Sequence, residues 1–577
     1  MSVAFSVEMD RSWVAGFAET IESTAVEALV HNLAQLGVEQ AYGVSGGGIG
    51  LLYDELVRSP IALHHFRHES GAVFAATEAH FASDAPTVAF CTTGPGLINA
   101  LTGMRAARAD GAKVILISGA TGGRQAGRWA TQETTSYTMP QDALYGSGAL
   151  FDYAIRVEHP VELPEVFRRL QMGVAHAGGF VAHVALPMSI LSQRIQTPAV
   201  APAASAISPV AAAKGEALCA ELLRQGPFAV WVGHGARHAD REVRSLVERT
   251  GATVFCSPRG KGVVSEKHPQ FIGVTGLGGH LEVNRYMTAR RPDWILVLGS
   301  RLSELTSLWD ADLKPRRGFL HVDLDREVPG TAYPDCQTIA FQAEIREFLG
   351  GLLQHFPFDD EKTEVVPFPR QMRSPLPETR YGLVREGVLM ETLQRRVVED
   401  SDALVLSDGG SASVLCNHHL KFTKPRRYRM TSYFGARGHY AAGVVGAALG
   451  RGGKAISILS EEAMLMSAEV SSAAQYKAAA VWIVLNRAGH SENERCHEAL
   501  GLNADNLNFP SVDYATLAES LGARGLRVQS EDQLDEAIQE ALVCEGPIVL
   551  DVWLDAPPAA GMELEPPVAE VADILGF

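Results

Sequence analysis

Short apolar runs alternate with amphipathic stretches along most of the chain. In the first part, strand-like runs occupy 87–93 and 113–119, and the stretch 69–83 has apolar side chains at helical spacing. Similar strand-like runs recur later, at 228–235, 252–258, 293–300, 318–325, 403–410, 454–462, 481–489 and 547–555. Buried strands that alternate with helices predict parallel sheets with helices on both faces. We therefore predict the α/β fold class, with three doubly wound parallel-sheet domains.

Two stretches without apolar periodicity separate the three parts. Residues 196–212 are rich in Ala, Pro and Ser, and residues 356–380 are rich in Pro and charge. They divide the chain into predicted domains at 1–195, 205–355 and 375–577. A chain of 577 residues is also too long for a single hydrophobic core.

The composition of the chain argues against several classes of partner. The net charge of −17, without a large Lys/Arg cluster, argues against nucleic acid. The longest apolar runs have strand length, so we expect no membrane span. The N-terminus lacks a basic-then-apolar signal pattern, and we expect a cytoplasmic protein. The seven cysteines are scattered without a C-x-x-C pair, which indicates neither a disulfide framework nor a zinc site.

The strand-like run at 456–460 leads directly into two glutamates, Glu461 and Glu462. Unpaired charge at the end of a buried strand is costly. These carboxylates therefore bind something positive, face water, or meet a partner inside the protein. Ligands of doubly wound sheets bind at the carboxyl ends of strands, so this strand end is a candidate site.

Motifs in all three parts resemble one known family, the thiamine-diphosphate enzymes, and within it the acetolactate synthase-like group. The motifs that resemble its pyrimidine-binding domain are YGVSGGG at 42–48 and the stretches 66–81 and 90–119. Those that resemble its central domain lie at 231–239, 258–276, 296–304 and 319–325. Those that resemble its diphosphate-binding domain lie at 404–414, 433–450 and 481–489. The similarity covers almost the whole chain, in order.

The resemblance assigns roles in the first domain. Glu69 stands where family members place the glutamate that protonates the aminopyrimidine ring of the cofactor. His68 borders it, and we include it among the catalytic candidates. The sequence TGPG predicts a tight turn at a strand end, where Gly94 and Gly96 allow close approach of the cofactor.

The third domain departs from the family pattern. The family reads Gly-Asp-Gly at a strand end and Asn-Asn after the next strand, and the Asp and an Asn hold the Mg²⁺ that binds the diphosphate. Here the first motif reads Ser460, Glu461 and Glu462, and the second reads Asn486 followed by Arg487. The resemblance thus implies Glu461 and Asn486 as metal ligands, and Ser460 and Glu462 beside the diphosphate.

A further departure lies at Arg437, where the family has an apolar residue under the bend of the cofactor. Arg437 is cationic and stands beside the expected thiazolium ring, so we count it among the catalytic candidates. Three alternatives remain open: Mg²⁺–thiamine diphosphate binds in the standard way, the glutamates are solvated at a loop, or Arg437 or Arg487 pairs with Glu461 or Glu462 and fills the site. The remaining expected cofactor-binding residues of this domain are Asp408, Gly409, Gly410 and Gly435.

The central domain offers a second candidate site. In the acetolactate synthase-like group, this domain sometimes binds FAD or ADP at strand-end loops. The residues that match this layout include Gly233, Arg259, Arg301 and Asp323. Arg301 follows a glycine at a strand end and suits a phosphate. Asp323 suits a ribose hydroxyl.

The leading hypothesis is an acetolactate synthase-like enzyme that makes or breaks a C–C bond next to the carbonyl of a small molecule, such as a 2-oxo acid. Two alternatives remain open: a flavoprotein that binds FAD and has lost thiamine diphosphate, and a non-catalytic or regulatory relative. The resemblance also implies a homodimer or homotetramer, with Glu69 facing Arg437 of the partner subunit.

Overall fold

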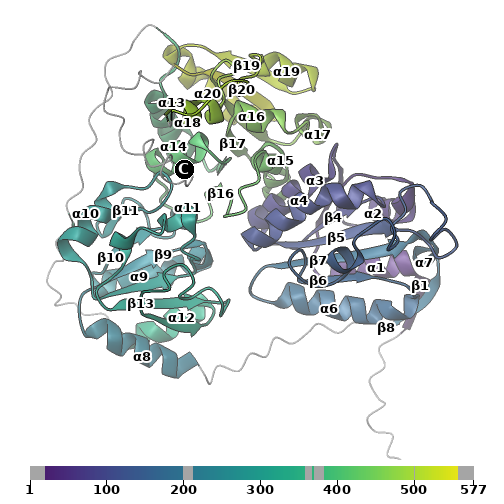
Figure 1. Cartoon of the computed structure of the whole chain (residues 1–577), viewed down its shortest axis with the longest axis horizontal. Coiled ribbons are helices and arrows are strands. Elements are labelled where there is room, and N and C mark those ends of the chain that lie inside the picture. Colours follow the sequence, from purple (N-terminus) through teal and green to yellow (C-terminus); the bar gives the residue numbers. More distant parts are fainter. Residues whose placement is uncertain (1–19, 199–211, 358–366, 369–381, 500, 556–577) are drawn as a thin grey trace, which may run out of the picture.

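The computed structural model describes residues 20–198, 212–357, 367–368, 382–499 and 501–555. Within these ranges the chain forms three lobes, each built on a six-stranded sheet whose strands are all parallel (Figure 1). The predicted fold class is thereby confirmed. Most of the two predicted linkers falls outside the described residues, and the domain boundaries drawn there stay predictions.

The first lobe has the strand order β3-β2-β4-β5-β7-β6. Its strands are β2 (Gln40–Gly43), β3 (Ala62–His65), β4 (Thr87–Cys91), β5 (Lys113–Ala120), β6 (Tyr153–Arg156) and β7 (Phe180–Pro187). Its helices are α1 (Ala25–Gln35), α2 (Gly50–Arg58), α3 (Glu69–Ser83), α4 (Pro95–Asp110), α5 (Gln141–Tyr145), α6 (Leu163–Ala175) and α7 (Met188–Leu191). An antiparallel pair, β1 (Thr20–Thr24) with β8 (Arg194–Pro198), joins the two ends of this lobe. All residues of β4 are buried, as expected for a strand covered on both faces.

The central lobe has the order β11-β10-β9-β12-β13-β14. Its strands are β9 (Phe228–Val232), β10 (Thr253–Cys256), β11 (Phe271–Val274), β12 (Trp294–Leu298), β13 (Gly318–Asp323) and β14 (Thr338–Gln342). Its helices are α8 (Ala212–Arg224), α9 (Asp240–Thr250), α10 (Leu281–Arg290), α11 (Glu304–Ser307) and α12 (Ile345–Leu352). The chain order reverses between the adjacent strands β9 and β12, which creates a crevice at their carboxyl ends.

The third lobe has the order β16-β15-β17-β18-β20-β19. Its strands are β15 (Leu404–Ser407), β16 (Tyr428–Met430), β17 (Ala455–Ser460), β18 (Ala480–Asn486), β19 (Arg524–Val528) and β20 (Ile548–Trp553). Its helices are α13 (Glu386–Leu393), α14 (Ser411–His419), α15 (His439–Arg451), α16 (Glu461–Leu465), α17 (Val470–Tyr476), α18 (Glu492–Ala499), α19 (Tyr514–Ser520) and α20 (Leu534–Val543). In order of chain position, its strands are arranged as those of the first lobe are, so β17 occupies the place of β4.

The first and third lobes pack against each other through α3 and α15, and residues of both lobes share one hydrophobic core (Figure 1). Glycines bring the two helix backbones together. A Cβ on Gly446 would lie 1.9 Å from the carbonyl oxygen of Ala75, and one on Gly450 would lie 2.8 Å from the Cα of Ala79. Larger side chains at these positions would force the helices apart.

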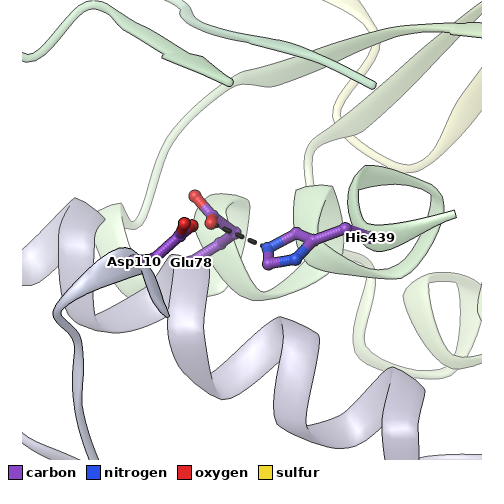
Figure 2. Close-up of side chains that lie close together, drawn as sticks. All are labelled: Glu78, Asp110 and His439. Carbon is purple, nitrogen blue, oxygen red and sulfur yellow. Dashed lines mark hydrogen bonds and ion pairs between the residues drawn. The ribbon is translucent and has the colours of Figure 1, made fainter. Parts of the chain in front are cut away.

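A buried ionic cluster ties the same two lobes together (Figure 2). The guanidinium of Arg429 donates to both carboxylate oxygens of Glu78, at 3.0 and 2.8 Å, and to Asp110 at 3.2 Å. The Nε2 of His439 lies 2.9 Å from Glu78. Burial by itself would raise the pKa of Glu78, but the charge of Arg429 and the hydrogen bonds from His439 and Arg429 outweigh it and hold the pKa at about 2.

None of the helices in the described ranges combines the length and the hydropathy that a bilayer crossing requires.

Candidate functional site

The predicted catalytic glutamate, Glu69, is the first residue of α3 and is 8% exposed. Its Oε2 accepts a hydrogen bond from the side-chain amide of Asn99 at 3.0 Å. Its Oε1 would lie 3.1 Å from a Cβ on Gly96, so the glycine provides the space beside the carboxylate. Glu69 and the TGPG turn, predicted to share a site, therefore do lie together.

The TGPG turn follows β4 and leads into α4. Gly94 has a φ of 59°, a left-handed conformation that favours glycine, and a Cβ there would lie 3.0 Å from Gln132. The Oε1 of Gln132 accepts a hydrogen bond from Thr93 at 3.1 Å. Neutral polar groups and one carboxylate thus line this end of the first sheet.

His68 is the N-cap of α3, and its Nδ1 accepts from the backbone amide of Ser70 at 3.2 Å. The backbone amide of His68 donates in turn to Glu469 of the third lobe at 3.0 Å. Burial raises the pKa of the Glu469 carboxyl, against the hydrogen bonds that it accepts. His68 therefore helps to start the helix that carries Glu69.

At the equivalent end of the third sheet, Glu461 is 2% exposed and binds backbone amides. Its Oε2 accepts from the amide of Arg487 at 2.7 Å, and its Oε1 from the amide of Gly489 at 3.2 Å. Burial raises the pKa of Glu461, whereas the two amide hydrogen bonds act in the opposite direction. Ser460 is the N-cap of α16, and its hydroxyl accepts from the amide of Ala463 at 3.4 Å.

Glu462 meets both an amide and a cation. Its Oε1 accepts from the backbone amide of Glu492 at 2.9 Å, and its Oε2 lies 3.5 Å from Nη1 of Arg437. The Nη2 of Arg437 donates to the carboxylate of Glu492 at 3.2 Å. The pairing of Arg437 with Glu462, which the sequence left open, is present.

Asn486 and Arg487 point away from the two glutamates of α16. The side-chain amide of Asn486 donates to Asp551 at 2.7 Å, and its oxygen accepts from the amide of Ala488 at 2.8 Å. The guanidinium of Arg487 pairs with Glu386. The oxygen of Asn486 thus already accepts one hydrogen bond, and its role as a metal ligand stays a prediction.

Asp408 is fully buried and accepts hydrogen bonds from the backbone amides of Gly409, Gly438 and Tyr440, at 2.9, 3.2 and 2.9 Å. Burial raises the pKa of its carboxyl, although these amides lower it. Asp408 thus fixes the turn before α15, which includes Gly435 with a φ of 55°.

Glu461 and Asn486, the two residues expected to bind Mg²⁺, both have hydrogen-bond partners within the protein. The carboxylates of Glu462 and Glu492 both contact Arg437. In the part of the chain that the structure describes, the one group of side chains spaced for a metal ion is Glu78, Asp110 and His439 (Figure 2). There the guanidinium of Arg429 already supplies the positive charge.

Three of the four residues predicted to bind a nucleotide, Arg259, Arg301 and Asp323, line one cavity of about 490 Å³. They meet at the carboxyl ends of the central strands, beside the β9–β12 crevice. Gly233 directly follows β9 and is not among the residues that line this cavity. The cavity also touches the other two lobes, at Lys113 and at residues 430–433. Burial raises the pKa of Asp323, and the Nε of Arg259 is buried without a hydrogen-bond partner in the described structure.

Three residues of these sites went unnoticed in the sequence. Asn99 looks like one more polar residue on a helix surface, and Arg237 of the cavity lies within the motif at 231–239 but was not assigned a role. Glu492 carried the clearest signal, because it is an acidic residue shortly after a strand end, as Glu461 and Glu462 are.

Comparison with known proteins agrees with this architecture. Residues 23–139 match the model of the thiamine pyrophosphate enzyme N-terminal TPP binding domain, residues 217–352 that of the central domain, and residues 408–552 that of the C-terminal TPP binding domain. Thiamine pyrophosphate is another name for thiamine diphosphate.

Relatives are similar over nearly their whole length. Acetolactate synthase isozyme 3 large subunit of Escherichia coli is 25% identical, over 90% of this chain and 92% of its own. Pyruvate oxidase of Lactiplantibacillus plantarum is 22% identical, over 95% of this chain and 92% of its own. The crystal structure of benzoylformate decarboxylase from Polynucleobacter necessarius shares the fold, with a TM-score of 0.78 and 18% identity over 92% of this chain and 98% of its own.

Thiamine diphosphate is the cofactor of the family that these comparisons identify, and its members include transferases and lyases. Three consecutive domain models, in the order and at the positions of the three lobes, place this chain among them. The chain belongs to the thiamine pyrophosphate enzyme family, in its acetolactate synthase-like group.

Proposed function

We propose that this enzyme makes or breaks the C–C bond next to the carbonyl of a 2-oxo acid, and that its cofactor site is non-standard. The relatives' names support the substrate class, because pyruvate and benzoylformate are 2-oxo acids. The buried Glu69 beside the TGPG turn supports retention of the pyrimidine end of the site.

One observation carries the second part of the proposal: carboxylates occupy the diphosphate end. Glu462 and Glu492 both contact the guanidinium of Arg437, and Glu461, next to Glu462, is bound by backbone amides. Repulsion between two unit charges about 4 Å apart amounts to roughly 4 kcal/mol at an effective dielectric constant near 20. We therefore infer that Mg²⁺–thiamine diphosphate does not bind here as it does in the family pattern.

Titration calorimetry with Mg²⁺ and thiamine diphosphate tests this inference. The wild type is compared with a variant that restores the family pattern: Ser460→Gly, Glu461→Asp, Glu462→Gly, Arg437→Met and Arg487→Asn. We expect binding in the variant alone, because it also loses the contacts of Glu462 and Arg437 that hold Glu492 at this end. The control is Glu498→Gln, which removes one exposed acidic charge from α18. Micromolar binding by the wild type, or cofactor carried through purification, would restore the ordinary family mechanism.

A nucleotide in the central cavity is the second candidate function, favoured by the meeting of Arg259, Arg301 and Asp323 at the β9–β12 crevice. If the nucleotide is FAD, the purified protein absorbs near ~450 nm, a property of the flavin itself. Arg301→Ala then removes a charge-assisted phosphate contact and weakens retention by about 1.5–3 kcal/mol. Arg316→Ala, an exposed change in the same lobe, is the control. A colourless protein that gives no heat with FAD would contradict this candidate.

We further propose that the protein is a cytoplasmic homodimer or homotetramer, with Glu69 close to Arg437 of the partner subunit. The family resemblance supports this assembly. Sedimentation at micromolar concentration should give a multiple of the 62.0 kDa chain mass, and a single-chain mass would contradict the proposal.

A further inference from the structure

Glu492, the first residue of α18, places its carboxylate at the start of another helix, α14. Its Oε1 accepts from the backbone amide of Ser411 at 2.7 Å and from the hydroxyl of the same residue. Ser411 is the first residue of α14, whose nine residues make it long enough to carry a positive N-terminal end. A carboxylate thus receives the contacts that a phosphate receives in an anion site of this kind.

The turn before α14 is shaped for that carboxylate. Gly410 has a φ of 78°, and a Cβ there would lie 2.1 Å from Oε2 of Glu492. Any other residue would therefore be strained and would also collide with the bound group. The site includes a backbone amide, a hydroxyl, a glycine turn and the guanidinium of Arg437, which donates to Glu492 at 3.2 Å.

The two glutamates of α16 hold the segment that carries Glu492. Glu461 binds the amides of Arg487 and Gly489, and Glu462 binds the amide of Glu492 itself. Between them, Ala488 has a φ of 59°, which is unfavourable for a residue with a Cβ. Carboxylate-to-amide bonds thus connect the ends of β17 and β18, where the family places a metal ion.

We propose that Glu492 is an internal substitute for a phosphate group, and that α18 is an autoinhibitory plug in an anion site formed by Gly410, Ser411 and Arg437. Removal of the Glu492 carboxylate opens this site to a diphosphate group. The inference rests on the proposed function, because it names the occupant of the non-standard diphosphate end.

Titration of the full chain with inorganic pyrophosphate tests the plug directly. The wild type should give no heat at millimolar pyrophosphate, whereas Glu492→Ala should bind it at least about tenfold more tightly. Glu492→Gln keeps the size of the side chain, so it tests the charge even if the alanine variant folds poorly. This variant should also bind pyrophosphate more tightly than the wild type does. The matched control Glu498→Gln changes an exposed glutamate on the same helix and should behave as the wild type does.

The double variant Glu492→Ala/Arg437→Met should lose the gained affinity, because the guanidinium is part of the site. Equal pyrophosphate affinity in the wild type and in both Glu492 variants would overturn the plug, as would a gain in affinity that Arg437→Met leaves unchanged. If the wild type binds neither Mg²⁺–thiamine diphosphate nor pyrophosphate and the Glu492 variants also bind no pyrophosphate, the plug fails while the proposed function stands. Tight Mg²⁺–thiamine diphosphate binding by the wild type would instead remove the proposed function.

Discussion

The strand ends of β4 and β17 occupy equivalent places in sheets of the same strand arrangement, yet their linings are opposite. After β4, Gly94 and Gly96 leave space beside Glu69. After β17, Glu461 and Glu462 bind amides from the segment that follows β18. We call the end of β4, with its two glycines, the open end, and the end of β17, whose carboxylates bind the following segment, the closed end.

The difference shows how little of a site the fold determines. Both sheets are specified by buried apolar strands, whereas the residues immediately after a strand decide whether its end receives a ligand or a protein group. Glu461 can be buried because two backbone amides satisfy its oxygens. The closed end is thus a stable structure in its own right, and the changes below measure how strongly it is held.

The largest expected effect comes from separating the two lobes that carry these ends. Glu78→Ala leaves Arg429 buried without its main partner, and we expect the free energy of unfolding to fall by about 3–5 kcal/mol. Urea denaturation provides the measurement. Glu165→Ala, which removes an exposed glutamate of α6, is the control. A loss below about 1 kcal/mol for Glu78→Ala would mean that the cluster does not join the lobes.

A smaller effect is expected from two variants that compare the strand ends directly. Glu461→Ala deprives the amides of Arg487 and Gly489 of their acceptor, and we expect a loss of about 2–3 kcal/mol in the free energy of unfolding. Asn99→Ala removes an exposed donor from Glu69 and should cost less than about 1 kcal/mol. Equal losses in the same denaturation experiment would contradict the contrast between a closed end and an open one.

Much of this arrangement follows from the sequence. The apolar runs predicted three parallel sheets, which the structure confirms, and TGPG predicted a tight turn at a strand end, where β4 does pass into α4. Ser460, Glu461 and Glu462 were predicted to lie at a strand end, and β17 does pass directly into α16 there. Such features depend on local pattern, which a single sequence displays.

The partners of the charged groups could not be predicted in the same way. Asn486 binds Asp551, which lies 65 residues away along the chain, and this pairing depends on the registration of β18 with β20. Glu492 sits in a polar stretch that resembles a solvated helix face. Its role depends on the orientation of α18 towards α14, which apolar periodicity does not specify.

The smallest effect is a dependence on pH. Because the pKa of Glu461 is raised in the folded protein above its ordinary value of 4.5, the folded state binds a proton more tightly than the unfolded state does. The stability that Glu461 contributes is fully present below pH 4.5 and is lost as the pH rises through the pKa of Glu461 in the folded protein. We therefore expect the stability of the wild type relative to Glu461→Gln to decrease from pH 4.5 towards neutral pH.

Glu165→Gln should behave in the opposite sense. Hydrogen bonds from Arg168 and Arg169 lower the pKa of Glu165 to about 2, so its contribution is present above the ordinary value and is lost only as the pH falls. Above pH 4.5 the difference between the wild type and this variant should stay constant. Denaturation curves for both variants at a series of pH values supply the comparison. A difference for Glu461→Gln that does not change with pH would mean that the amides of the β18 segment offset the cost of burying its charge.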